Sequence, residues 1–171
     1  MKINYVKGNA TAPVIEKDRV ALIPHVCNIN GGWGAGFVLA LSKKWKQPEQ
    51  SYREWFAKKL INEYDNNIYE FALGGIDPVP VEPNIIVVNM LAQQGYKSKT
   101  NLVPVRYWHL VHCMESVLDF AKRNIKNPTI HAPKFASDLG GASWEVIEQL
   151  IEDIWIANKI PVTIYLWEGD K

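Results

Sequence analysis

Apolar and polar positions alternate along the chain with two different periods, and the changes of period predict the order of strands and helices. Largely apolar runs at 19–27 and 84–91 are typical of strands buried on both faces of a sheet. The segment 106–124 instead repeats its apolar residues every three or four positions, as an amphipathic helix does. The alternation predicts an α/β fold, with helices on both faces of a mixed sheet.

Shorter elements complete this pattern. Further strands are predicted at 3–6, 129–132 and 161–167, and a short edge strand within the turn-rich segment 71–83. The segment 37–45 is predicted to be a helix. A second helix is predicted to begin at Pro48 and to carry Tyr52, Trp55, Phe56 and Leu60. A third is predicted to follow Ser143 as N-cap and to carry Ile147, Leu150, Ile151 and Ile154. No repeat or long linker divides the chain, so we expect one domain over residues 1–171.

Composition narrows the class of protein. With 47% hydrophobic and 22% charged residues, the 171-residue chain can bury a core without disulfides or metals. The formal net charge of +1 gives no polybasic field, so we do not expect a nucleic-acid or membrane partner. The N-terminus has no apolar signal core, and the cysteines Cys27 and Cys113 form no framework. We therefore expect a cytoplasmic monomer with free thiols.

Three glycine-bearing loops follow predicted strands. They are Gly8-Asn9-Ala10, the stretch PHVCNINGGWGAGF at 24–37, and ASDLGGAS at 136–143. In open α/β sheets ligands bind beyond the carboxyl ends of the strands, and the last two loops run into helix N-termini, which suit phosphate. The spacing matches neither the P-loop nor the dinucleotide fingerprint. Two interpretations stay open here: a cradle for a diphosphate, or glycines that serve tight turns only.

Four side chains in or near these loops have both a structural and a functional interpretation. His25, at the end of a strand, is either a core residue or a proton-transfer group. Asp138 either bonds its own loop backbone or pairs with His25 across a pocket. Cys27 is either a buried filler or a nucleophile, and Trp167 either caps the core or stacks on a base.

The remaining histidines do not indicate a metal site. His109 and His112 lie on one face of one helix, which supplies too few ligands. His131, inside a short strand, is expected to be structural. We therefore predict no metal and no cofactor.

Four motifs carry a resemblance to a known family. They are YVKGN at 5–9, IPHVCNINGGWGAGFVLALSKKW at 23–45, NMLAQQG at 89–95 and PKFASDLGGASW at 133–144. In this order they resemble the macrodomain family, and most closely its ADP-ribose 1''-phosphate phosphatases. The resemblance covers residues 3 to 167. It implies a three-layer α/β/α sandwich with a mixed central sheet, and ADP-ribose as a ligand across the strand ends.

The resemblance also implies roles for individual residues. The turn formed by Gly8, Asn9 and Ala10 would face the adenine, with Trp167 stacking nearby. Many macrodomains carry aspartate where this chain has Asn9, which can still accept from the adenine amino group through its amide oxygen. The distal ribose would be oriented by Asn28 and Asn30, beside Cys27.

The diphosphate would lie between two loops. The first would wrap it with backbone N–H groups, and its residues are Gly32, Trp33, Gly34, Ala35, Gly36 and Phe37. The second would consist of Ser137, Leu139, Gly140, Gly141, Ala142 and Ser143, together with Asp138.

His25 and Asp138 are the predicted catalytic residues. His25 stands where many macrodomains that bind ADP-ribose without catalysis carry asparagine. An imidazole can transfer a proton or hold a leaving phosphate, whereas an amide cannot transfer a proton. Asp138 stands where glycine is usual and would orient His25 or a water. The predicted reaction converts ADP-ribose 1''-phosphate into ADP-ribose and phosphate, with loop amides stabilising the developing charge.

Two other functions are alternatives. One is a non-catalytic module that reads ADP-ribose. The other is an ADP-ribosyl hydrolase acting on modified protein or nucleic acid. ADP-ribosyl-glutamate hydrolases use a lysine near the position of Ala92 and an aspartate near Gly140, and this chain has neither.

Overall fold

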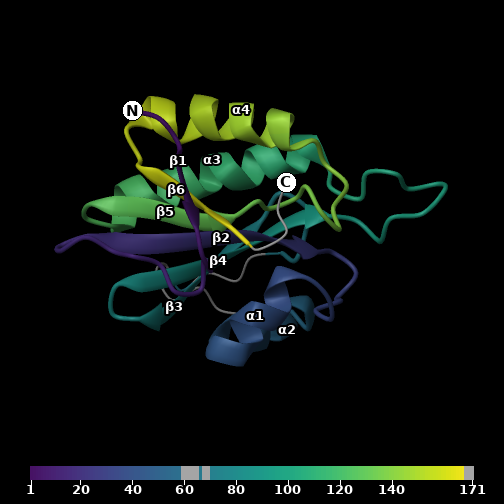
Figure 1. Ribbon diagram of the computed structural model, residues 1–171. Helices are drawn as coiled ribbons and strands as arrows, with labels where there is room; N and C mark the ends of the chain where they lie inside the picture. Colours follow the sequence, from purple (N-terminus) through teal and green to yellow (C-terminus); the bar gives the residue numbers. More distant parts are fainter. Residues whose placement is uncertain (59–65, 67–69, 168–171) are drawn as a thin grey trace.

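A computed structural model describes residues 1–58, 66 and 70–167 (Figure 1). The elements in chain order are β1 (Asn4–Lys7), β2 (Val20–Asn28), α1 (Phe37–Lys44), α2 (Gln47–Phe56), β3 (Ile76–Glu82), β4 (Ile85–Gln93), α3 (Tyr107–Asn124), β5 (Pro128–Pro133), α4 (Trp144–Ile154), the short 3-10 helix η1 (Ile156–Asn158) and β6 (Val162–Leu166). Figure 1 shows α3 and α4 over one face of the sheet and α1 and α2 over the other. The three-layer α/β/α sandwich is confirmed.

The sheet is mixed, as predicted, and its topology creates one functional edge. The strand order is β1-β6-β5-β2-β4-β3, and every neighbouring pair is parallel except β3 with β4. Five strands therefore point the same way, and their carboxyl ends meet at one edge of the sheet. This is the edge at which α/β proteins bind their ligands.

Each face of the sheet has its own core. The core under α3 and α4 is largely aliphatic, whereas the core under α1 and α2 is rich in aromatic residues, namely Trp33, Trp45, Tyr52 and Trp55. The predicted apolar stripe of 106–124 is largely confirmed, but α3 also buries Cys113 and Phe120. Cys113 contacts the carbonyls of Gly75 and Leu91, and Phe120 lines a pocket with Ile76 and Pro78, so the buried arc extends toward β4 and β3 and is wider than the sequence pattern indicated.

Three local predictions differ from the structure or lie outside it. The predicted short edge strand is β3, with seven residues, and its prolines Pro78 and Pro80 suit an edge position. Ser143 does precede α4, but its side chain makes no cap hydrogen bond. Leu60, predicted to continue the second helix, lies outside the described residues.

His131 is structural, as expected, and it ties the segment after β1 to the sheet. Thr129 donates to the Val20 carbonyl, so its Oγ1 accepts from His131 Nε2–H at 3.0 Å. His131 Nδ1 in turn accepts from the Tyr165 hydroxyl at 2.9 Å, and Tyr165 accepts from Val14 N at 3.0 Å. Burial lowers the pKa of His131 to about 4, which agrees with this neutral tautomer.

This arrangement predicts a loss of stability in mild acid. His25 is also buried, with its pKa lowered to about 4. In the unfolded chain both histidines titrate near 6.5. The unfolded state therefore gains protons first, and the free energy of unfolding should fall as pH drops from about 6.5 to about 4, by about 1.4 kcal/mol for each unit of pKa difference. Urea unfolding at pH 7.0 and 4.5 measures this fall.

Substitution of His131 tests whether this residue causes the loss of stability in acid. His131→Gln should lose less stability between these two pH values than the wild-type protein does, while His112→Gln, at an exposed position of α3, should behave like wild type. Equal losses in all three proteins would contradict the role given to His131.

Candidate functional site

The loops that follow the carboxyl ends of the strands gather at one end of the molecule. Figure 1 shows the segments after β2, β4 and β5 on the same side, with the segment 94–106 projecting furthest from the body. Gly8 N donates to the Leu166 carbonyl at 3.0 Å, which brings the first predicted loop beside Trp167. The structure thus brings all the sequence-predicted loops to the same edge.

In the first glycine-rich loop, most glycines make room for side chains from other segments. A Cβ at Gly31 would lie 2.9 Å from the Phe56 ring, and one at Gly32 would collide with the Tyr96 hydroxyl. A Cβ at Gly36 would lie 3.1 Å from Leu139 of the second loop. The first two glycines therefore serve close packing, whereas the structure leaves open space beside Gly34. Gly34 and Ala35 are exposed and remain the part of the loop open to a ligand.

The second loop uses several of its backbone groups within the protein. Gly141 N donates to the Asp138 carbonyl at 3.1 Å and Ala142 N to the Ala136 carbonyl at 3.0 Å. Ser143 N donates to the Tyr107 hydroxyl at 2.9 Å. These three N–H groups, predicted to belong to a phosphate-binding loop, are engaged elsewhere. Gly140 makes room for Val105, since a Cβ there would collide with that side chain.

Ala136 adopts a left-handed backbone conformation in this loop, with φ of 68°. A Cβ disfavours that conformation by about 1 kcal/mol, and glycine lacks it. Ala136→Gly should therefore raise the free energy of unfolding by up to about 1 kcal/mol, which urea denaturation measures. The same substitution at Ala132, a strand residue, should lower it. A destabilised Ala136→Gly protein would show that the strain assigned to this position is absent.

The two asparagines predicted at the distal ribose have structural partners. Asn28 donates through Nδ2 to the Gly95 carbonyl at 2.7 Å and accepts from Gly95 N at 3.0 Å, which fastens the segment 94–106 to the end of β2. Asn30 Oδ1 accepts from Gly32 N at 3.1 Å and shapes the glycine-rich turn. Asn30 is exposed, whereas Asn28 is 6% exposed.

Asn9 differs from what the resemblance implied. Its amide oxygen already accepts from Thr11 N at 2.9 Å and from Thr11 Oγ1 at 2.8 Å. An amide oxygen has two lone pairs, and both have donors here. The side chain therefore presents its NH₂ group, a donor, to a ligand instead of the expected acceptor. Ala10 beside it is buried, and Gly8 is exposed.

His25 lies under the glycine-rich loop, inside the aromatic core. The residue is 2% exposed, and its ring makes edge contacts with Trp33 and Phe37 at centroid distances of 5.5 and 5.9 Å. Burial lowers the pKa of His25 to about 4, while a 2.5 Å hydrogen bond between Nε2 and Asn89 Oδ1 acts in the opposite direction. The imidazole is therefore neutral at pH 7, so it can accept a proton, and its lowered pKa makes it a weaker base than an exposed histidine.

Cys27, Asp138 and Trp167 complete the predicted set. Burial raises the pKa of the Cys27 thiol well above its ordinary value, so the thiolate needed for a nucleophile is not formed at neutral pH. Asp138 is exposed, and the partner of His25 Nε2 is Asn89 instead. The structure thus does not form the His25–Asp138 pair considered from the sequence. Trp167 is 63% exposed at the end of β6.

Sequence reasoning missed a polar group on β4. Asn89 is fully buried and contacts both His25 and Asp77. A signal was present, because Asn89 is the polar residue inside the apolar run IIVVNML. Tyr96, which packs on Gly32 from the projecting segment, was also missed and had no comparable signal.

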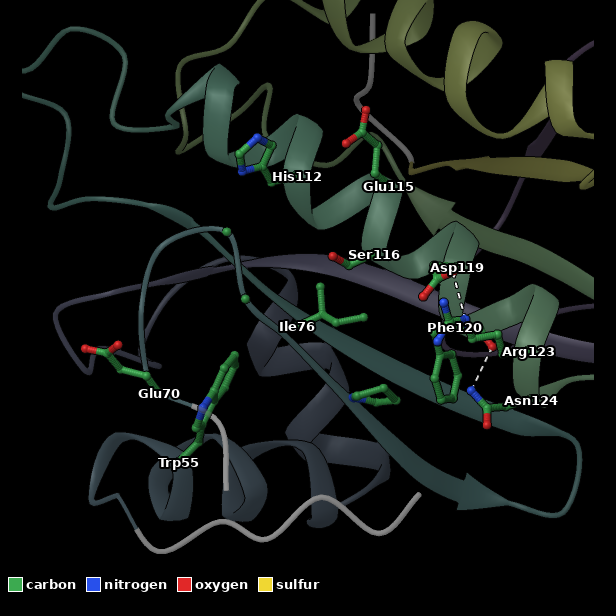
Figure 2. A pocket seen from close by; sticks show the side chains of 13 residues that line it. Trp55, Glu70, Ile76, His112, Glu115, Ser116, Asp119, Phe120, Arg123 and Asn124 are labelled. Carbon is green, nitrogen blue, oxygen red and sulfur yellow. Dashed lines mark hydrogen bonds and ion pairs between the residues drawn. The ribbon is translucent and has the colours of Figure 1, made fainter. Parts of the chain in front are cut away.

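A separate pocket lies away from this edge. Its volume is about 810 Å³. Figure 2 shows it between α3 and the start of β3. Its labelled side chains include Glu115, Asp119 and Arg123 of α3, with Trp55 and Ile76 opposite. None of the predicted site residues lines it, so it is distinct from the candidate site.

Two further features bear on the predictions. Within residues 1–58, 66 and 70–167, no three His, Cys, Asp or Glu side chains are grouped so that they could hold a metal ion. The helices in that part of the chain are all too short or too polar to cross a membrane.

Comparison with known proteins identifies the family. No family model matches the chain. A macrodomain protein from Streptomyces coelicolor has a similar structure, with 40% sequence identity, a TM-score of 0.77, and coverage of 96% of this chain and 98% of that one. A protein of unknown function from Bacteroides thetaiotaomicron is 41% identical, with a TM-score of 0.86 and coverage of 97% and 98%. The chain belongs to the macrodomain family.

A curated relative adds a more distant similarity. The ADP-ribose 1''-phosphate phosphatase of Saccharomyces cerevisiae is 24% identical over 188 residues, which cover 95% of this chain and 97% of that protein. The family recognised from the four sequence motifs is confirmed.

Proposed function

We propose that this macrodomain binds ADP-ribose across the carboxyl ends of its strands and removes the 1''-phosphate from ADP-ribose 1''-phosphate. The observation that carries the proposal is a neutral imidazole, His25, three residues before the end of β2 and directly beneath a glycine-rich loop. The name of the Saccharomyces cerevisiae relative supports the choice of reaction. The products are ADP-ribose and phosphate.

The ligand is placed by the order of the loops along the edge. The adenine lies at Gly8, Asn9 and Ala10, close to Trp167, and its contact with Asn9 is to the side-chain NH₂ group. The diphosphate runs past the open backbone at Gly34 and Ala35. The distal ribose and its phosphate then lie at the end of β2, near Asn30.

The chemistry needs a proton acceptor and stabilisation of phosphate charge. His25 accepts a proton from the attacking water because its pKa near 4 keeps the ring unprotonated at pH 7. Backbone N–H groups of residues 34–37, at the start of α1, stabilise the negative charge that develops on the phosphate. Asp138, exposed on the second loop, is a candidate for holding the water.

Phosphate release and calorimetry test this proposal together. Purified protein should release inorganic phosphate from ADP-ribose 1''-phosphate with multiple turnovers, and calorimetry should show binding of ADP-ribose. If the protein binds ADP-ribose but releases no phosphate, the phosphatase proposal is wrong and the non-catalytic ADP-ribose-binding module is favoured.

Non-catalytic recognition of ADP-ribose is the second candidate function. It is favoured by the enclosure of His25, a residue that is 2% exposed and whose Nε2 is committed to Asn89. The third alternative, the glutamate-linked hydrolase mechanism, gains no support. Ala92 is fully buried, and Gly140 packs against Val105, so neither position supplies a functional group.

A further inference from the structure

A row of polar side chains crosses three neighbouring strands on the face covered by α1 and α2. His25 of β2 is the register partner of Asn89 of β4, and Asn89 is the register partner of Asp77 of β3. The row ends at Ser51 of α2, whose hydroxyl donates to Asp77 Oδ2 at 2.6 Å. The strand neighbours of this row on the same face are apolar, among them Ile23, Val87 and Leu91. A polar row in such surroundings is costly to bury unless every member is hydrogen-bonded.

The hydrogen bonds of Asn89 fix the orientation of its amide. Nδ2 donates to the Pro48 carbonyl at 3.1 Å and to Asp77 Oδ2 at 3.3 Å. Both partners are acceptors, so a flipped amide would point its oxygen at two other oxygens. Oδ1 is therefore the atom that faces His25 Nε2, at 2.5 Å.

This orientation determines the tautomer of His25. An amide oxygen can only accept, so Nε2 must carry the proton. In the neutral ring Nδ1 then holds the lone pair. Cys27 Sγ lies 3.9 Å from Nδ1 and 3.8 Å from Nε2, and a thiol is a weak hydrogen-bond partner, so it commits neither nitrogen. Nδ1 is thus the ring nitrogen that is not committed to the row.

We propose that Asn89, held by Asp77 and Ser51, is the positioning residue that keeps His25 in its Nε2–H tautomer and makes Nδ1 the proton acceptor of the reaction. The inference rests on the proposed phosphatase function. A water loses a proton to Nδ1 as its oxygen bonds to phosphorus. The bond between phosphorus and the ribose O1'' breaks, and that oxygen takes the proton back from Nδ1. The products are ADP-ribose and inorganic phosphate.

The titratable groups around His25 decide which residue the pH dependence of kcat/KM reports. Cys27 faces it from β2, Asp77 lies behind Asn89 on β3, and Tyr52 of α2 packs on Trp33 above the ring. Burial raises the pKa of Cys27 and of Tyr52, so both are uncharged near neutral pH. A shift of the acidic limb of kcat/KM that follows a substitution within the row therefore reports a change at His25.

Nitrogen NMR of histidine-labelled protein tests the tautomer directly and needs no substrate. The spectrum of the ligand-free protein at pH 7 should show His25 protonated at Nε2 and bare at Nδ1, with its signals assigned by their loss in His25→Asn. His131, which donates from Nε2 to Thr129, gives an internal reference of the same pattern. A spectrum with His25 protonated at Nδ1 overturns the proposal, even if the enzyme is active.

A charge-neutral swap tests the positioning role. Asn89→Asp combined with Asp77→Asn places the carboxylate directly beside Nε2 and keeps the tautomer, at a cost in stability because one carboxylate oxygen then faces the Pro48 carbonyl. An opposite charge at this distance should raise the pKa of His25, so the acidic limb of kcat/KM should move upward by at least about one pH unit. The control swap, Asn124→Asp with Asp119→Asn on the surface of α3, should leave the limb in place.

The outcomes separate this inference from the proposed function. An unmoved limb in the Asn89–Asp77 swap contradicts the positioning role, while a shifted limb with the Nε2–H tautomer supports it. If the swapped protein does not fold, the tautomer of the wild-type protein still decides the proposal. Absence of phosphate release by the wild-type protein defeats the phosphatase function, and the NMR result is unaffected by it.

Discussion

His25→Asn is expected to lower phosphate release from ADP-ribose 1''-phosphate by at least about 100-fold, because an amide cannot accept the proton and general-base catalysis contributes about 10²–10⁴-fold. ADP-ribose binding, measured by calorimetry, should change by no more than about threefold, since the loop backbone that holds the diphosphate is untouched. Steady-state kinetics and calorimetry on the same preparation give both quantities.

A control guards this result against loss of structure. The substitution leaves Asn89 Oδ1 without its present donor in a buried site, which costs about 1–3 kcal/mol of stability. Thermal unfolding should therefore confirm a folded protein at the assay temperature. His112→Asn, at an exposed position on α3 beside the pocket of Figure 2, should keep full activity. Full activity in His25→Asn would remove His25 from the mechanism.

Gly140→Ala should have the largest effect on the second loop. The new methyl group would collide with Val105 and would lie 2.6 Å from the Ala136 carbonyl oxygen, which is backbone and cannot turn aside. Overpacking of this kind costs about 1–3 kcal/mol, and the displaced loop should also weaken ADP-ribose binding. Urea denaturation and calorimetry measure the two effects.

Gly34→Ala is the matched variant in the first loop. A Cβ there has no protein atom within 4 Å, so stability should stay within about 0.5 kcal/mol of wild type. Binding of ADP-ribose should nevertheless weaken if the diphosphate passes this backbone. A Gly140→Ala protein as stable as Gly34→Ala would refute the packing role of Gly140.

The sequence predicted the fold because its signals were periodic and local. The apolar runs that form β2 and β4 and the amphipathic stripe of α3 can be recognised without any tertiary contact. Cys113 was not recognised as a core position, because the width of a buried helical arc depends on how many elements pack against it.

The site was predictable as a set of loops but not as a set of contacts. The oxygen of Asn9 is taken by Thr11, two residues away, in a local turn that competes with ligand binding and leaves no mark in the motif. The partner of His25 is Asn89, 64 residues away, and their contact arises from the strand register. Asn89 was visible as an oddity in an apolar strand, but its orientation depends on Pro48 and Asp77.

The glycines illustrate the same limit. The motif left two interpretations open, tight turns or a phosphate cradle, and the structure assigns a different role to each glycine. Gly31 and Gly32 accommodate Phe56 and Tyr96, whereas Gly34 faces open space. Such a division depends on side chains from distant segments, which no local pattern contains.

A crystal structure of the protein with ADP-ribose bound tests the central claim most directly. The claim is that His25 acts on the distal ribose end of the ligand from beneath the glycine-rich loop. We predict that His25 Nδ1 lies about 2.6–3.2 Å from the C1'' hydroxyl, or reaches it through one water. The claim would be contradicted if the side chains of Trp33 and Phe37 lay between the imidazole and the C1'' hydroxyl of the bound ADP-ribose.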